Sequence, residues 1–403
     1  MTRFAPANAT ELAATVSWAA AESQSLEIVA GGSKRGFGRP VQAAHTLDVG
    51  ALRGVTDYDA AELVLSARAA TPMAEIGALL AEQRQMLAFE PPDWSGLLGA
   101  APGRQTLGGV IACNLAGPRR VRAGATRDHF LGFAAVNGWG DAWKAGGTVV
   151  KNVTGYDLCK LQAGAHGTLS VLTDLSVRVL PLPETSCSLL LGGLSDAEAI
   201  RTLSRALNTP HEVSGACHLP EAAAARSGVA EVAGLGASVS ALRLEGPAPS
   251  VAARLSALEA LLGGGVCLPA EGSAALWNEI AAVQPLLSST SSVVWRVCTA
   301  PAGSPALLAR LRGTWPQAEA FYDWGGGLLW LSVEAPGDDG GAATVRAAIT
   351  GGHATLVRAS EALRHAVAVF EPEAPPLAAL SRRVKDSFDP RRILNPGRMR
   401  IGT

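Results

Sequence analysis

The sequence has no long hydrophobic run. Its longest apolar stretches, Leu107–Ala116 and Phe130–Val136 among them, are short and contain glycine, whereas a membrane span needs about 20 apolar residues. Near the N-terminus, Glu11 and Glu22 interrupt any apolar segment that could act as a signal peptide. We therefore expect neither a membrane-spanning segment nor a signal peptide.

Cysteine clusters and blocks of like charge are also absent. The chain has six cysteines but no Cys-x-x-Cys pair, which excludes the local spacing of an iron–sulfur or zinc site, and no metal site is predicted. Reduced, mostly buried thiols in a cytoplasmic protein are the expectation. The 34 basic and 35 acidic side chains nearly balance, so no nucleic-acid partner is expected.

Hydrophobic residues make up 48% of the 403 residues, which allows a large core and predicts two or three domains. The run Leu180-Pro181-Leu182-Pro183 cannot continue a central strand, because proline lacks the N–H donor. It separates a first domain over residues 1–183 from a second over residues 184–370. A third segment, residues 377–403, is predicted to return to the first domain as a helix, Leu377–Met399, that ends in a turn at residues 395–397.

The second region alternates between strand and helix patterns. Ser188–Leu191 is predicted as a strand, and Ser195 with Glu198 has the form of a capping box at the start of a helix. Further strands are expected at Val239–Leu244, Val293–Val297 and Trp330–Val333, with helices capped at Ser250 and Ser304. This alternation predicts an α+β, ferredoxin-like cap domain.

The first glycine cluster, Ile28–Gly36, is an apolar strand that runs into a loop with two cations. Successive glycines let backbone N–H groups point into one concavity, which suits a phosphate or pyrophosphate. The spacing is neither that of a P-loop, because Phe37 follows Gly36, nor that of a Rossmann fingerprint, because Gly38 is followed by Arg39-Pro40. A plain tight turn remains the alternative for this loop.

Two more glycine clusters follow. In Gln105–Asn114, small residues would let a flat ligand lie close to the backbone, and Asn114 supplies a directional polar group. A core helix is the less favoured alternative here, because a glycine costs about 1 kcal/mol in a helix interior. The third cluster is Gly146–Asp157, which continues into Gly164–Leu169.

Taken together, the order and spacing of these motifs resemble the vanillyl-alcohol-oxidase (PCMH-type) FAD domain. The resemblance includes Arg127–Gly132 and a C-terminal signature, Phe388–Met399. The stretches Pro91–Trp94, Ser214–Pro220 and Asp323–Gly326 are similar to the family of FAD-binding subunits of bacterial glycolate oxidase. The resemblance implies an α+β chain with a PCMH-type two-subdomain FAD-binding domain and a ferredoxin-like cap.

The same resemblance implies FAD as the cofactor, bound without a covalent link because the first loop contains no histidine. It assigns the pyrophosphate to Gly31, Gly32, Ser33, Lys34 and Arg35. It assigns the isoalloxazine and ribityl groups to Thr106, Gly108, Gly109 and Asn114, and the closing of the cleft to Arg127, Asp128, Gly167 and Thr168. The chain departs from the family pattern at Ala30 and Ser170, where glycine is usual, and both changes narrow the cleft slightly.

Candidate catalytic residues are few. The seven histidines include no His-x-His pair, and only His353, in the remnant Gly351–Thr355, lies where the family has its histidine motif. His353 is a candidate base, with a structural role as the alternative. Arg296 lies within an apolar strand and is a candidate ligand for a substrate carboxylate, with an internal salt bridge or a solvent-exposed head as the alternative. Arg358 is a weaker candidate of the same kind, and Trp324 a candidate apolar wall.

These features predict an FAD-dependent oxidoreductase subunit of a glycolate oxidase complex, which oxidises glycolate to glyoxylate or acts on a similar 2-hydroxy acid such as D-lactate. A second FAD subunit with the intact histidine motif and an iron–sulfur subunit are the expected partners, and membrane contact would come only through them. A self-sufficient dehydrogenase and a non-catalytic assembly subunit are the alternatives. Against the assembly role, we expect that neither the glycine loop nor the Thr-Leu-Gly-Gly cluster is needed for packing.

Overall fold

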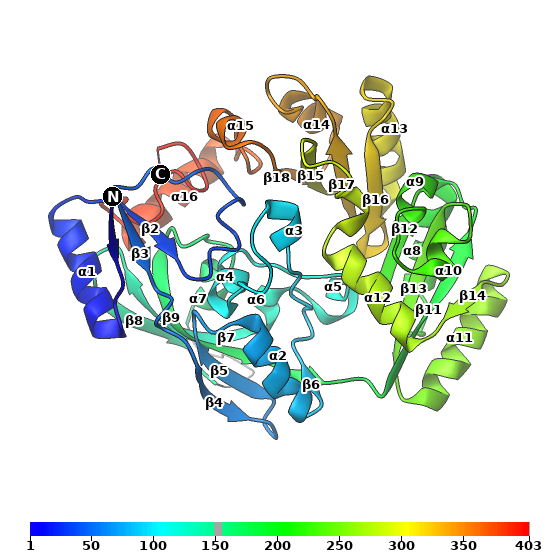
Figure 1. The fold of residues 1–403 in the computed structure, drawn as a ribbon, viewed down its shortest axis with the longest axis horizontal. Helices are drawn as coiled ribbons and strands as arrows, with labels where there is room; N and C mark the ends of the chain where they lie inside the picture. Colours follow the sequence, from blue (N-terminus) through cyan, green and yellow to red (C-terminus); the bar gives the residue numbers. More distant parts are fainter. Residues whose placement is uncertain (149–154, 403) are drawn as a thin grey trace. The chain divides into compact units, whose positions relative to one another are not determined.

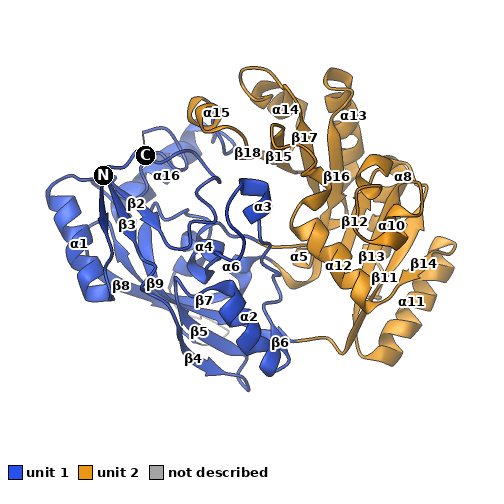
Figure 2. Cartoon of the chain, in the orientation of Figure 1, with its two compact units in different colours: residues 1–115, 125–181, 368–403 blue, residues 116–124, 182–367 orange. Residues whose placement is uncertain are grey.

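The computed structural model describes residues 1–148 and 155–402. The chain forms two compact units (Figure 2). Unit 1 comprises residues 1–115, 125–181 and 368–403, and unit 2 comprises residues 116–124 and 182–367. The expected first domain, residues 1–183, includes the segment 116–124 that the structure assigns to unit 2. Part of the third glycine cluster, residues 149–154, lies outside the described residues.

Unit 1 begins with a small parallel sheet of order β1-β3-β2, formed by Thr2–Phe4, His45–Asp48 and Leu26–Val29. The helix α1, Ala9–Ala21, buries Leu12, Val16 and Ala19. Their spacing of four and three residues places them on one face of the helix. That face shares a core with residues of β2, β3 and the C-terminal segment, including Leu26, Leu47 and Leu394.

The larger sheet of unit 1 is antiparallel, with the order β4-β5-β9-β7-β8. Its strands are Val55–Asp59, Val64–Arg68, Ser170–Arg178, Phe130–Asn137 and Ala142–Gly146, and β6 (Gln85–Met86) pairs separately with β10 (Leu180–Pro181). Figure 1 shows these strands with the helices of this unit. Besides α1, the helices are α2 (Met73–Glu82), α3 (Ser95–Leu98), α4 (Leu107–Ala112), α6 (Thr126–His129), α7 (Leu158–Gln162) and α16 (Pro375–Phe388).

Unit 2 contains one eight-stranded sheet of order β14-β11-β13-β12-β16-β17-β15-β18. Its first half runs β11 (Thr185–Gly192), α8 (Asp196–Leu207), β12 (Gly215–Leu219), β13 (Val239–Gly246), α11 (Ala248–Leu262) and β14 (Val266–Leu268). Its second half runs β15 (Val293–Cys298), α13 (Ser304–Thr314), β16 (Glu319–Asp323), β17 (Leu328–Val333), α14 (Ala342–Ala348) and β18 (His353–Arg358).

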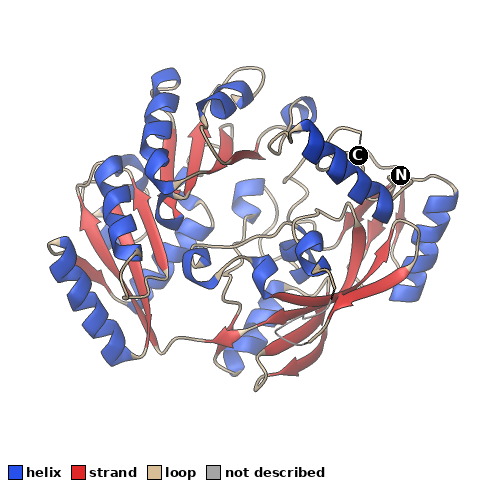
Figure 3. Cartoon of the chain, turned by 180° about the vertical axis from the view of Figure 1, so that it is seen from behind, coloured by secondary structure: helices blue, strands red, loops and turns tan. Residues whose placement is uncertain are grey.

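Each half is therefore a βαββαβ unit whose fourth strand lies beside its first. This is the ferredoxin-like topology, and Figure 3 shows its strands and helices in colour. The two halves join edge to edge where β12 pairs with β16, at His218 and Tyr322. The predicted ferredoxin-like cap is confirmed, and the structure adds that the motif occurs twice. Four short helices and one longer helix, α12, complete the helices of the unit: α5 (Arg120–Ala123), α9 (Glu221–Ala224), α10 (Ala230–Ala233), α12 (Ala270–Ala281) and α15 (Glu361–Ala366).

Local signals predicted the element types better than their ends. The capping box of Ser195 and Glu198 is confirmed at the start of α8. The predicted starts of two helices are wrong: α11 is capped by Pro247 rather than Ser250, and α13 by Gly303 rather than Ser304. The predicted C-terminal helix is too long, because α16 ends at Phe388. The Asp389 carboxylate then accepts the N–H groups of two later residues, Ile393 and Leu394, which fixes a turn in place of further helix.

Among the described residues, no helix combines the length and the hydrophobicity that crossing a bilayer requires.

Candidate functional site

A cleft with an empty volume of about 900 Å³ opens within unit 1. Part of this empty space is open to solvent. The wall consists of the end of β2, the first glycine loop, α4, the start of β9 and two residues of the C-terminal segment, Asn395 and Arg398. Segments that are distant in the sequence thus form one site.

The first glycine loop is held close to the backbone of residues 103–106. The Arg104 guanidinium donates to the Gly31 carbonyl at 2.7 Å. A Cβ atom on Gly31 would lie 1.7 Å from the Arg104 carbonyl oxygen. Gly32 has φ +75°, a conformation that favours glycine. The turn therefore has the shape that was expected, but the expectation that its glycines are not needed for packing is wrong for Gly31.

The second glycine cluster forms the helix α4, which was the less favoured alternative, and this helix also lines the cleft with Thr106, Gly108 and Gly109. Thr106 caps α4 by accepting the Gly109 N–H at 3.3 Å. A Cβ atom on Gly108 would lie 2.8 Å from the Ala69 carbonyl oxygen, so this glycine too is needed for packing. At Gly109 the nearest atoms to such a Cβ would be Thr106 Oγ1 at 3.3 Å and Lys34 Nζ at 3.7 Å. Gly109 thus keeps the cleft wall flat beside a cation.

Three cations line the cleft, Lys34, Arg35 and Arg398, and the buried Glu27 carboxylate pairs with the last two. Burial lowers the pKa of the Lys34 ammonium group, while the nearby Cys113 and Asp93 act in the opposite direction. Arg398 is almost fully buried and donates to the carbonyl oxygens of Arg35 at 3.0 Å and Phe37 at 3.2 Å. Buried cations and a glycine turn together suit a pyrophosphate.

One wall of the cleft carries a neutral imidazole. Burial, with the Arg398 guanidinium acting in the same direction, lowers the pKa of His166 to about 3. His166 is therefore uncharged at neutral pH. Its ring lies 5.3 Å from the Phe37 ring and 4.9 Å from the Phe370 ring, and its Nδ1 lies 3.7 Å from the Cys113 sulfur. This wall suits the apolar part of a flat ligand.

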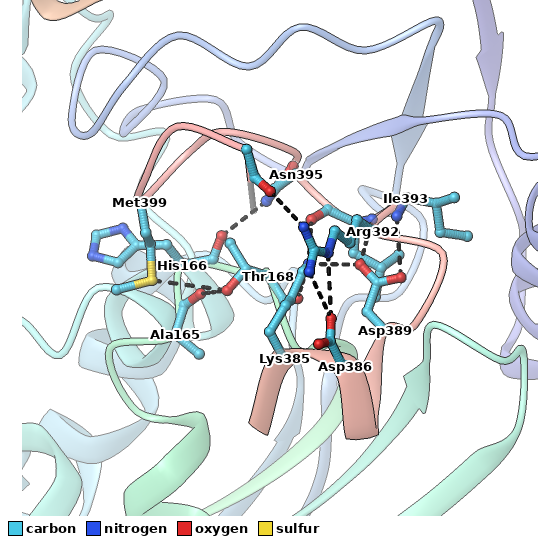
Figure 4. A network of polar contacts seen from close by, with 12 residues as sticks. Ala165, His166, Thr168, Lys385, Asp386, Asp389, Arg392, Ile393, Asn395 and Met399 are labelled. Carbon is cyan, nitrogen blue, oxygen red and sulfur yellow. Dashed lines mark hydrogen bonds and ion pairs between the residues drawn. The ribbon is translucent and has the colours of Figure 1, made fainter. Parts of the chain in front are cut away.

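The C-terminal segment completes the cleft (Figure 4). The Asn395 side chain accepts the Ile28 N–H at 2.8 Å and donates to the His166 carbonyl at 2.9 Å. The buried Lys385 ammonium donates to the Thr168 carbonyl and to the Asp389 carboxylate, both at 2.6 Å. The predicted list of cofactor residues omitted Asn395 and Arg398, although the C-terminal signature that contains them was the available signal.

Nine of the predicted cofactor residues line the cleft, namely Gly31, Gly32, Ser33, Lys34, Arg35, Thr106, Gly108, Gly109 and Gly167. The other four do not belong to its lining. Thr168 faces a second cavity beside α16. Asn114 accepts the Arg127 N–H at 3.1 Å, and Asp128 accepts the Ala125 N–H at 2.8 Å. These contacts order the chain that leaves and re-enters unit 1 around residues 116–124. Ala30 and Ser170, the two departures from the family pattern, both line the cleft.

The two candidate catalytic residues lie on neighbouring strands of unit 2. Arg296 on β15 has its guanidinium 5.0 Å from the Trp324 ring centre. It forms no ion pair with a carboxylate in the described part of the chain, so the alternative of an internal salt bridge is not observed. His353 begins β18 opposite Cys298. Arg358 donates to the carbonyl oxygens of Ser289 at 2.7 Å and Ser292 at 3.2 Å, which gives it a structural role.

Residues 1–148 and 155–402 contain no group of three His, Cys, Asp or Glu side chains that could hold a metal ion.

Comparison with known proteins agrees with this geometry. A family described as FAD binding domain matches residues 3–146. The crystal structure of p-cresol methylhydroxylase with substrate bound has a TM-score of 0.70 at 13% identity, and the match covers 99% of this chain and 88% of that one. The fold and the glycine-walled cleft with its three cations fit FAD and define the class: an FAD-linked oxidoreductase with the PCMH-type fold.

The relatives identify the particular family. Glycolate oxidase subunit GlcE of Escherichia coli (strain K12) is 35% identical over 384 residues, which is 95% of this chain and 95% of that protein. Glycolate oxidase subunit GlcD of Bacillus subtilis (strain 168) is 40% identical over 102 residues, which is 25% of this chain and 21% of that protein. The chain belongs to the family of the glycolate oxidase subunit GlcE.

Proposed function

We propose that this chain is the FAD-binding subunit of a complex that oxidises glycolate to glyoxylate. The match to GlcE along nearly the whole of both chains supports this proposal, together with the cleft of unit 1. The partners in the proposal are a second FAD subunit, related to GlcD, and an iron–sulfur subunit. Cytoplasmic location, with membrane contact only through these partners, is part of the same proposal.

In this proposal the cleft residues hold FAD without a covalent bond. The backbone N–H groups of Gly31–Arg35 and the Lys34 and Arg398 cations bind the pyrophosphate. Thr106, Gly108, Gly109 and Gly167 lie along the flat rings, while Asn114, Arg127, Asp128 and Thr168 keep the wall in place. Bound flavin supplies a hydride acceptor. FAD that is released into the supernatant after acid precipitation would agree with non-covalent binding, and FAD that stays in the pellet would contradict it.

Substrate chemistry is assigned to Arg296, as a ligand of the substrate carboxylate, and to His353, as a base. The described residues contain no group of three His, Cys, Asp or Glu side chains that could add a metal to His353, so this histidine alone offers limited acid–base chemistry. We therefore assign to this chain a flavin that carries electrons or stabilises the complex, and assign most of the oxidation chemistry to the second FAD subunit.

The test is the visible spectrum of the purified chain before and after anaerobic addition of glycolate. We expect flavin absorbance that persists with glycolate alone and bleaches once the partner subunits are added. A colourless chain would contradict the proposal, and bleaching by glycolate alone would show a self-sufficient dehydrogenase.

A matched pair of variants ties the flavin to the cleft. Gly109→Val extends a side chain from α4 toward Lys34 and should reduce the FAD content at least tenfold. Gly77→Val makes the same change on the exposed face of α2, where no atom lies within 4 Å of the added Cβ, and should leave the FAD content unchanged. Equal FAD content in the two variants would place the flavin elsewhere.

A further inference from the structure

The segment 116–124 leaves unit 1 and packs entirely within unit 2. Three contacts hold it there. Arg119 forms a two-pronged ion pair with Glu245, at 2.8 and 3.0 Å, and both side chains are largely buried. Arg122 pairs with Glu212. The Trp324 indole N–H donates to the Gly117 carbonyl at 3.1 Å. Arg120, between the two paired arginines, is thereby held in a defined position.

Trp324 is itself held in an unusual conformation. Its φ is +52°, which is rare for a residue with a large side chain. The Asp323 carboxylate accepts its backbone N–H at 2.7 Å, and its indole N–H is bonded to Gly117. Strain of this kind persists only where the surrounding structure fixes it, and it is common at binding sites. The indole is therefore a rigid platform.

Two guanidinium groups lie on this platform. The Cζ atom of Arg120 lies 4.5 Å from the ring centre of Trp324, and that of Arg296 lies 5.0 Å from the same centre. Their Cζ atoms are therefore no farther apart than the sum of these two distances. The charges of both arginines act on the Cys298 thiol, so both lie near that residue. Guanidinium groups are suited to carboxylate recognition, because their planar set of N–H donors matches the two carboxylate oxygens.

A thiol and an imidazole border the same place. Arg296 and Cys298 are two residues apart on β15, so their side chains are on one face of the sheet. His353 is the cross-strand partner of Cys298. Burial acts to raise the pKa of the Cys298 thiol, but Arg296, a hydrogen bond with His353 and Arg120 outweigh it, and the pKa is lower than usual. The surroundings of Cys298 thus favour negative charge.

We propose that Arg120 and Arg296, stacked on Trp324, form a binding site for the carboxylate of a short 2-hydroxy acid, with Cys298 at its edge. Arg120 is the added ligand, and Trp324 is the residue that positions both cations. The choice of a 2-hydroxy acid rests on the proposed function. The carboxylate itself is inferred from the two arginines beside Trp324, independently of that function.

The two alkylating reagents iodoacetate and iodoacetamide test this site in the full chain. In both reactions the Cys298 thiolate displaces iodide and forms a carbon–sulfur bond, but only iodoacetate carries a carboxylate. Mass spectrometry of the digested protein gives the rate at Cys298 and at Cys267, an exposed thiol of the same unit that serves as the internal standard. We expect the ratio of the iodoacetate to the iodoacetamide rate to be at least tenfold higher at Cys298 than at Cys267.

Variants and competitors make the test specific. Arg120→Gln and Arg296→Gln should each lower the ratio at Cys298 at least fivefold. Arg201→Gln, at an exposed position of α8 in the same unit, should leave it unchanged. Glycolate should protect Cys298, whereas ethylene glycol, which lacks the carboxylate, should not.

Each outcome has a clear meaning. Equal ratios at Cys298 and Cys267, or a ratio that does not respond to Arg120→Gln in a protein with unchanged circular dichroism, would overturn the site. Protection by sulfate equal to that by glycolate would show a general anion site and overturn the carboxylate assignment. Alkylation does not depend on flavin content, so failure of this site is separate from failure of the proposed function, which the visible spectrum reports.

Discussion

The two units of this chain solve opposite packing problems. Unit 2 fills the space around its sheet with large side chains, and Trp277, Trp295, Tyr322 and Phe321 are among the largest fully buried residues of the described chain. Unit 1 leaves a cleft of about 900 Å³ and fixes its walls by close backbone contacts and buried ions. The comparison teaches that glycines and buried ions shape the cleft of unit 1, which also has an apolar core of its own, whereas unit 2 combines apolar packing with a repeated topology.

The largest expected effect comes from adding one methyl group in unit 1. Gly31→Ala places a Cβ atom 1.7 Å from the Arg104 carbonyl oxygen, so the backbone of the cleft must move, at a cost of about 4 kcal/mol. Thermal unfolding and FAD content should both decrease sharply. Gly77→Ala, on an exposed helix face of the same unit, should instead stabilise by about 0.5–1 kcal/mol. If both variants changed the stability by the same small amount, unit 1 would not depend on the close approach of the Gly31 and Arg104 backbones.

The buried ion pair of unit 1 is the next target (Figure 4). Lys385→Met removes the donor to Asp389 and to the Thr168 carbonyl and should cost about 3 kcal/mol, because a buried carboxylate loses its counter-ion. Chemical denaturation measures the loss. Arg382→Met, at an exposed position of the same helix, is the control and should change the free energy of unfolding by less than about 0.5 kcal/mol. A loss as small as that of the control would mean that the two backbone N–H groups suffice for Asp389.

Acid should destabilise unit 1 before unit 2. His166 has a folded-state pKa of about 3, below its unfolded value of about 6.5. The unfolded chain therefore binds the proton first, and stability decreases as the pH falls from 6.5 toward 3. Since one side of the ring faces the cleft, we expect a loss of about 3 kcal/mol.

In unit 2 the corresponding group is Glu245. Burial acts to raise its pKa, but hydrogen bonding to Arg119 and the charge of Arg243 lower it to about 2. Its contribution, about 3 kcal/mol, is complete above pH 4.5 and is lost as the pH falls toward 2. Hydrogen exchange in the FAD-free protein, followed from pH 7 to 3, should show unit 1 opening at a higher pH. His166→Gln should remove the early transition, and simultaneous opening of both units would contradict this order.

The smallest expected loss of stability comes from removing a helix N-cap, and it should be equal in the two units. Asn8 caps α1 by accepting the Glu11 N–H, and Ser195 caps α8 by accepting the Glu198 N–H. Asn8→Ala and Ser195→Ala should each cost about 1 kcal/mol, because each leaves one N–H group of a helix end without its partner. Urea denaturation measures both losses. A loss above about 3 kcal/mol at either cap would show a role beyond capping.

The sequence allowed much of the fold to be predicted where the signal is local. The strand before the first glycine loop, the strands of unit 2 and the capping box of α8 depend on neighbouring residues only. Helix ends were predicted less well, because α11 and α13 begin after Pro247 and Gly303 without a side-chain cap, so no serine marks their first residue. Nine of the predicted cofactor residues line the cleft, whereas Asn114, Arg127, Asp128 and Thr168 are not part of its lining.

The sequence by itself was enough to predict a glycine turn after the first apolar strand and the alternation of strands and helices in the second region. It also carried the resemblance that led to FAD. The tertiary structure alone decided that the ferredoxin-like motif is doubled, that Asn395 and Arg398 join the cleft, and that residues 116–124 bring Arg120 onto Trp324. The physical reason is that propensities and caps act over a few residues. Contacts between distant segments depend on which backbones can approach closely and which buried polar groups find partners.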